Sequence, residues 1–67
     1  MASLDHTRVA ALASTVDDHA GRAAELAEQL AAGGDDTVAA VLYEAERSLR
    51  MASRTLERAV AALRDAP

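Results

Sequence analysis

The sequence contains no cysteine, so neither a disulfide bond nor a thiolate zinc site can stabilise the fold. Lysine, phenylalanine and tryptophan are also absent, and tyrosine and proline each occur once. Of the 34 apolar residues 18 are alanine, which leaves few large side chains for a core. A chain of 67 residues buries only about 60% of the surface that its unfolded form exposes. We therefore expect no enclosed active-site cavity in a single copy.

Long apolar runs and excess positive charge are missing as well. The longest stretches without a charged residue, 9–16 and 37–43, are much shorter than the ~20 residues of a membrane span. The first residues contain neither the basic nor the apolar region of a signal peptide. We expect a cytoplasmic protein with no membrane association. The net charge of −4 disfavours general binding to nucleic acid phosphates.

Gly33-Gly34 is the one strong interruption of an otherwise helical pattern, and it lies almost at the middle of the chain. Glycine ends helices well because it adopts the left-handed conformation, and the Asp35-Asp36-Thr37 segment that follows can cap a new helix. The sequence predicts a single all-α domain over residues 1–67. We expect a helix at about 4–32, a turn at 33–36 and a second helix at about 37–65.

Both predicted helices carry a heptad repeat, in which seam residues follow each other in alternating steps of four and three. This seam comprises Ala2, Asp5, Val9, Leu12, Val16, His19, Ala23, Leu26 and Leu30 in the first helix, and Val38, Leu42, Ala45, Leu49, Ala52, Leu56, Ala59, Leu63 and Ala66 in the second. If the chain folds back at the glycines, residues whose numbers add to 68 lie opposite each other, and large side chains alternate with small ones. The pattern predicts an antiparallel two-helix hairpin with the seam inside.

Two helices leave such a seam open to water on both flanks. We expect a second hairpin to close it, so that a homodimer forms a four-helix bundle. One flank consists mainly of small residues, which are easily desolvated and let helices approach closely. We predict that the dimer interface is formed by Ala13, His19, Ala20, Ala27, Ala39, Ser53 and Val60. His19 is either a packed polar residue that fixes the register or a titratable group that responds to pH.

No residues have the spacing of a catalytic, cofactor or metal site. His6 and His19 lie far apart, and neither has a second metal ligand three or four residues away. A cysteine nucleophile is lacking, and the paired glycines are typical of a turn instead of a phosphate-binding loop. The sequence therefore predicts a protein that is not an enzyme and that binds neither a cofactor nor a metal.

Arg47, Arg50, Arg54 and Arg58 follow each other at steps of three, four and four on the outer face of the second helix. Tyr43 precedes them by one turn and Met51 lies alongside, and both residue types are common anchors of protein interfaces. We predict that these six residues bind an unidentified protein, with the chain acting as an adaptor or regulator. The simpler alternative is a solvated face on which the arginines pair with Glu44 and Glu46.

The layered hairpin with its central turn resembles the ROP-type bundle in length and in the alternation of large and small layers. ROP-like proteins bind paired RNA loops, and the resemblance implies an alternative function in which the four arginines bind nucleic acid. The hairpin is also similar to the WXG100 proteins, which are secreted pairs of antiparallel helices around a central turn. The turn here reads Ala32-Gly33-Gly34 and has no tryptophan, so this second resemblance is the more remote alternative.

Overall fold

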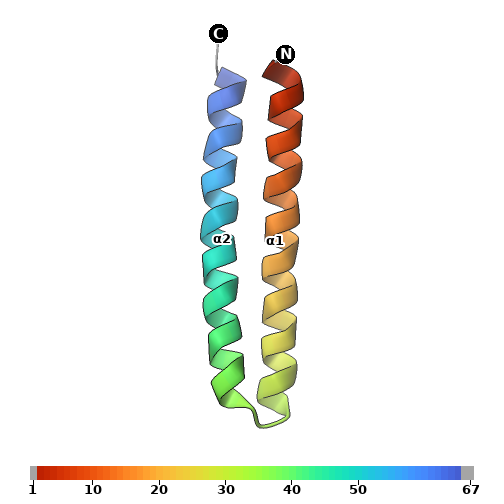
Figure 1. The fold of residues 1–67 in the computed structure, drawn as a ribbon, viewed down its shortest axis with the longest axis vertical. Helices are drawn as coiled ribbons and strands as arrows, with labels where there is room; N and C mark the ends of the chain where they lie inside the picture. The colour runs from red at the N-terminus through yellow and green to blue at the C-terminus, as the bar shows by residue number, and fades with distance from the viewer. Residues whose placement is uncertain (1, 66–67) are drawn as a thin grey trace.

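The computed structural model describes residues 2–65, which form two long helices joined by a short turn (Figure 1). α1 spans Ala2–Ala32 and α2 spans Asp36–Asp65, so each helix begins one or two residues earlier than the sequence predicts. The helices run antiparallel, and no strand occurs among the described residues. The predicted all-α hairpin is confirmed. The seam residue Ala66 lies outside the described residues, as does the side chain of Ala2.

The turn is built by backbone hydrogen bonds that end α1. Asp35 donates its N–H to the carbonyl oxygen of Leu30 at 2.8 Å, and Gly34 donates to Ala31 at 3.0 Å. These two bonds are those of a Schellman motif, in which the residue after the helix adopts the left-handed conformation. Gly34 has a φ of +93° and fills that position. The chain therefore reverses at the place where the sequence has its paired glycines.

Asp35 caps the amino terminus of α2 immediately after the turn. Its carboxylate accepts a hydrogen bond from the N–H of Val38 at 3.2 Å, and its carbonyl accepts from Ala39 at 3.1 Å. This is the geometry of an N-cap, which satisfies one of the free N–H groups of the first helical turn. The same residue thus closes one helix and opens the next.

A column of small side chains fills the space between the helices. The buried residues in the described part of the chain are Ala13, Ala20, Ala23, Ala27, Ala39, Ser53 and Val60, and Ala20 and Ala27 are 0% exposed. Apart from Ala23, these residues repeat every seven positions, with Glu46 half-buried in the same column. A hydrogen bond from Ser53 Oγ to the carbonyl oxygen of Ala13, 3.3 Å long, sets the register. Residues whose numbers add to 66, not 68, therefore face each other in this column.

The position of this column corrects two sequence-based assignments. The seam was expected inside the hairpin, but Ala23 is its one buried member among the described residues. The flank expected to carry the dimer contact is instead the inside of the hairpin. The residues concerned are Ala13, Ala20, Ala27, Ala39, Ser53 and Val60. They contact the other helix of their own chain and are closed to a second copy, whereas His19 is exposed.

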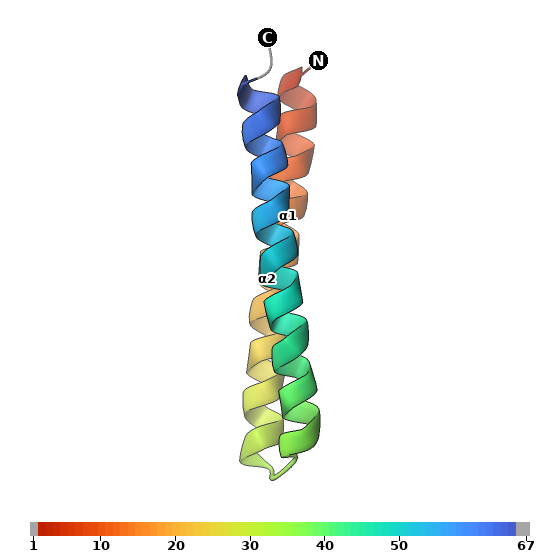
Figure 2. The same ribbon diagram turned by 90° about the vertical axis from the view of Figure 1, so that its left-hand side faces the viewer.

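The hairpin is a thin rod. Its Cα atoms extend over 53 × 14 × 9 Å, and their radius of gyration is 15.4 Å. A compact chain of this length has a radius of gyration of about 11 Å. The helices cross at a shallow angle, as heptad-patterned helices do (Figure 2). No large side chain in the described part of the chain is fully buried, so most apolar contact surface lies at the edges of the helix pair.

The turn geometry predicts different effects for two neighbouring glycine substitutions. Gly34→Ala should lower the free energy of unfolding by about 1–2 kcal/mol, because a side chain is strained at positive φ. Gly33→Ala is the control, since its added Cβ would lie 3.6 Å from two backbone oxygens, an ordinary contact. Urea unfolding followed by circular dichroism measures both variants. Equal destabilisation by the two substitutions would contradict the assignment of Gly34 to the left-handed position.

Candidate functional site

The hairpin exposes large apolar side chains on one side of the buried column. We call this surface the apolar face; it consists of Val9, Leu12, Val16, Leu26 and Leu30 of α1 and Val38, Leu42, Leu49, Leu56 and Leu63 of α2, together with the seam alanines between them. Leu12 is 51% exposed, Leu26 is 36% exposed and Val38 is 44% exposed. The face follows the seam over both helices. The heptad pattern therefore identifies the edge of the helix contact and the surface beside it.

The apolar face has an inner and an outer part, because residues seven apart form a column along each helix. The inner columns border the helix contact and are mostly half-buried: Val9, Val16, Ala23 and Leu30 on α1, and Leu42, Leu49, Leu56 and Leu63 on α2. The outer columns are exposed: Asp5, Leu12, His19 and Leu26 on α1, and Val38, Ala45, Ala52 and Ala59 on α2. The outer column of α1 is thus mainly bulky, and that of α2 is mainly small.

The opposite side of the hairpin is a polar groove with a volume of about 650 Å³. It is lined by His6, Ala10, Ala13, Ser14, Asp17, Arg50, Ser53, Arg54, Glu57, Val60 and Arg64. Three arginines and two carboxylates supply its charged lining. The Nε2 atom of His6 is buried there without a hydrogen-bond partner in the described part of the chain. His6 lies seven residues before Ala13 and so continues the buried column of α1.

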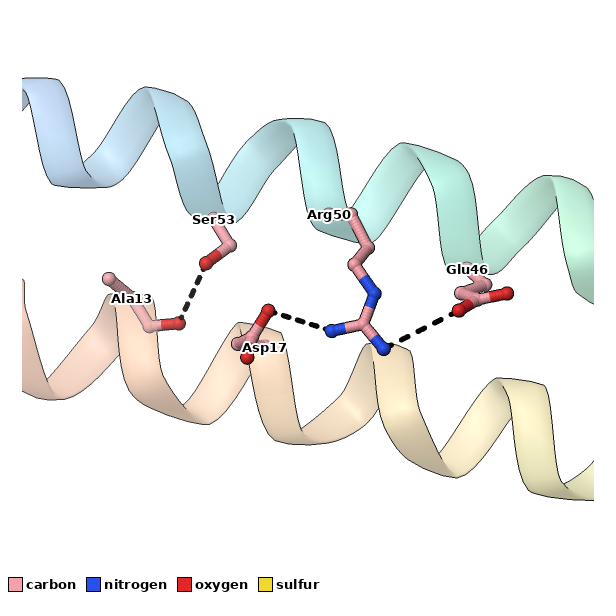
Figure 3. A network of polar contacts seen from close by, with 5 residues as sticks. All are labelled: Ala13, Asp17, Glu46, Arg50 and Ser53. Atoms are coloured by element: carbon pink, nitrogen blue, oxygen red, sulfur yellow. Dashed lines mark hydrogen bonds and ion pairs between the residues drawn. The ribbon is translucent and has the colours of Figure 1, made fainter.

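Arg50 connects the two helices across this groove (Figure 3). Its Nη1 atom lies 2.9 Å from Oδ1 of Asp17 on α1, and its Nη2 atom lies 3.4 Å from Oε2 of Glu46 one turn earlier on α2. The side chains of Arg50 and Asp17 are 38% and 53% exposed, so water screens their attraction. Exposed pairs of this kind contribute roughly 0.2–1 kcal/mol. Arg50 therefore acts mainly as a link between the helices.

The six residues predicted to bind a partner protein lie on the polar side of α2, away from the apolar face. Met51 is 63% exposed, Arg47, Arg54 and Arg58 are exposed, and Tyr43 is half-buried. Among the described residues these three arginines form no ion pair, and the i,i+4 pair between Glu46 and Arg50 does form. The structure thus leaves most of the predicted surface open while Arg50 is already engaged. Asp17, its partner across the groove, was not singled out by the sequence pattern.

The described residues form neither a metal site nor a membrane span. Within residues 2–65, no three histidine, aspartate or glutamate side chains come together in a way that could hold a metal ion. Neither α1 nor α2, over its described length, is apolar enough to cross a lipid bilayer.

In comparisons with known proteins, no family model, no curated protein and no solved structure matches this chain.

The buried column makes a testable prediction about the helix contact. Ala20→Leu should lower the free energy of unfolding by about 1–3 kcal/mol, because a side chain that is 0% exposed has no room to grow. Ala11→Leu is the control, since Ala11 is exposed on the same helix. Thermal and urea unfolding measure both. A stable Ala20→Leu hairpin would show that the helices do not approach closely at this column.

Proposed function

We propose that the chain is a non-enzymatic interaction protein, an adaptor or regulator, which works as a homodimer in a four-helix bundle. The observation that carries the proposal is the apolar face, on which Leu12, Leu26 and Val38 are exposed and the inner columns are only half-buried. Monomeric proteins rarely expose contiguous apolar patches larger than a few hundred Å². Burial of apolar surface stabilises association by about 25 cal/mol per Å². A second copy that covers this face therefore supplies the core that one hairpin lacks.

The polar side of α2 is the proposed binding surface for another protein. Met51 is an exposed apolar side chain, and Arg47, Arg54 and Arg58 provide positive charge without an ion-pair partner in the described residues. Arginine and methionine are enriched in protein interfaces, and arginine binds carboxylates through two parallel hydrogen bonds. This surface lies on the other side of α2 from the apolar face. Dimerisation thus leaves it accessible, and an acidic protein surface fits its charge.

The second candidate is a nucleic-acid-binding dimer that uses the same arginines. The free guanidinium groups of Arg47, Arg54 and Arg58 favour it, because phosphates are natural ligands of arginine. The net charge of −4 and the absence of lysine oppose it, since long-range attraction to a phosphate backbone is missing. A protein partner is therefore the first choice.

Two single substitutions to arginine should separate dimerisation from partner binding. Leu12→Arg introduces a charge into the apolar face and should weaken the dimer by about 100-fold, because the charge is desolvated in the interface. Met51→Arg is the control, because it adds the same charge at an exposed apolar side chain on the polar side of α2. This variant should leave the dimer intact. Sedimentation equilibrium over a range of protein concentrations measures both. A wild-type chain that stays monomeric at high micromolar concentration would refute the proposed dimer.

The partner surface is tested by affinity capture with matched charge changes. Arg54→Glu on the polar side of α2 should abolish capture of the partner that wild-type protein retains. Arg8→Glu changes the charge equally on α1 and should leave capture unchanged. Fluorescence anisotropy with structured RNA and duplex DNA at ~0.15 M salt tests the second candidate. If Arg54→Glu removes nucleic acid binding but does not remove capture of a protein, nucleic acid binding becomes the first candidate function.

A further inference from the structure

We infer that the second copy docks on the apolar face with both turns at the same end of the bundle, so that α1 of each copy lies beside α2 of the other. This inference rests on the proposed dimer and specifies its geometry. The copies are then related by a twofold axis that runs parallel to the helices.

The surface area of the hairpin fits a second copy of the chain. Its accessible surface is 4749 Å², whereas size scaling gives ~4,040 Å² for a compact monomer of 7.0 kDa. The excess of about 700 Å² is close to the ~800 Å² that each partner buries in a standard interface. The apolar face also runs along both helices, which have 31 and 30 residues, so one copy covers the other over its whole length.

The outer columns of the apolar face complement each other in size. Leu12, His19 and Leu26 project from α1, whereas Ala45, Ala52 and Ala59 leave space on α2. Bulky side chains pack best when they enter spaces between small ones. Because a single chain carries both the bulky and the small column, the complement of each column is present in a second copy. This self-complementarity requires that α1 and α2 of different copies be neighbours.

The register of the hairpin places the bulky residues opposite the spaces. The hydrogen bond between Ser53 and Ala13 puts residues whose numbers add to 66 at the same height. A twofold axis parallel to the helices preserves height, so Leu12 comes level with residue 54 of the partner subunit. It then lies between Ala52 of the partner subunit and Ala59 of the partner subunit.

The same rule holds for the other two bulky residues. His19 comes level with residue 47 of the partner subunit, between Ala45 of the partner subunit and Ala52 of the partner subunit. Leu26 comes level with residue 40 of the partner subunit, between Val38 of the partner subunit and Ala45 of the partner subunit. Leu12 and His19 therefore meet spaces between alanines, and Leu26 lies between a valine and an alanine.

The alternative arrangement, with the turns at opposite ends, lacks this fit. It places α1 beside α1 and α2 beside α2, so bulky columns face each other on one side and alanines face each other on the other. The two sides of the bundle would then need different helix spacings.

The arrangement also determines how a partner protein is bound. With α1 beside α2 of the other copy, the two α2 helices lie diagonally across the bundle. Their Met51 and Arg54 side chains then face in opposite directions. The dimer therefore presents two separate binding surfaces instead of one combined surface.

Distance measurement between spin labels tests the arrangement directly. The chain has no cysteine, so Ala32→Cys near the turn and Ala61→Cys near the other end each provide one label per copy. Both residues are exposed and lie off the apolar face. Pulsed dipolar spectroscopy should give about 25–35 Å at both sites, the width of a four-helix bundle of helices 10–12 Å across. Adding Leu12→Arg to either labelled chain should remove the dipolar signal.

The other outcomes separate this inference from the proposed dimer. A distance of about 45–50 Å between the labels at Ala32→Cys, close to the length of a 30-residue helix, would show turns at opposite ends and overturn the inference alone. A labelled chain that sediments as a monomer and gives no dipolar signal would overturn both the dimer and its geometry.

Discussion

The close approach of α1 and α2 along a column of alanines is the contact on which the whole arrangement depends. Because Ala13 has only a methyl side chain, the backbones come near enough for the Ser53 hydroxyl to reach a main-chain carbonyl on the other helix. Larger residues at this column would separate the helices and remove that bond. The closeness has a second effect: no space remains between the helices for leucine. The large apolar side chains are therefore displaced to one side of the pair.

This displacement gives the hairpin two unlike sides. On one side, Leu12 and its neighbours remain partly exposed to water, at a cost that only another apolar surface removes. On the other side, Arg50 joins the helices through Asp17, and arginines without ion-pair partners in the described residues surround a groove. The polar contacts are exposed and individually weak, so they orient the helices more than they stabilise them. The same two helices thus have one apolar side and one polar side.

The sequence predicted the helices and the turn well because local signals determine both. Gly34 requires a left-handed backbone and Asp35 caps a helix regardless of what packs nearby. The helix contact was misassigned because the heptad pattern shows where large apolar residues lie, and we expected these to pack within one chain. The repeat of Ala13, Ala20 and Ala27 is visible in the sequence. Whether these alanines form the helix contact depends on how closely the two backbones approach, and the sequence pattern does not give that distance. The pairing of Arg50 with Asp17 joins residues that are 33 positions apart in the sequence. It depends on how the two helices are aligned with each other, which no local pattern determines.

The tight turn also gives the rod a direction. Three residues separate α1 from α2, so the two helices meet at one end, while the start of α1 and the end of α2 lie side by side at the other (Figure 1). If two copies align their turns, four helix termini gather at one pole and two closed loops form the opposite pole, with hairpins 53 Å long between them. Such a bundle is a rigid spacer with unlike poles, and anything attached to the helix termini is held far from the loops.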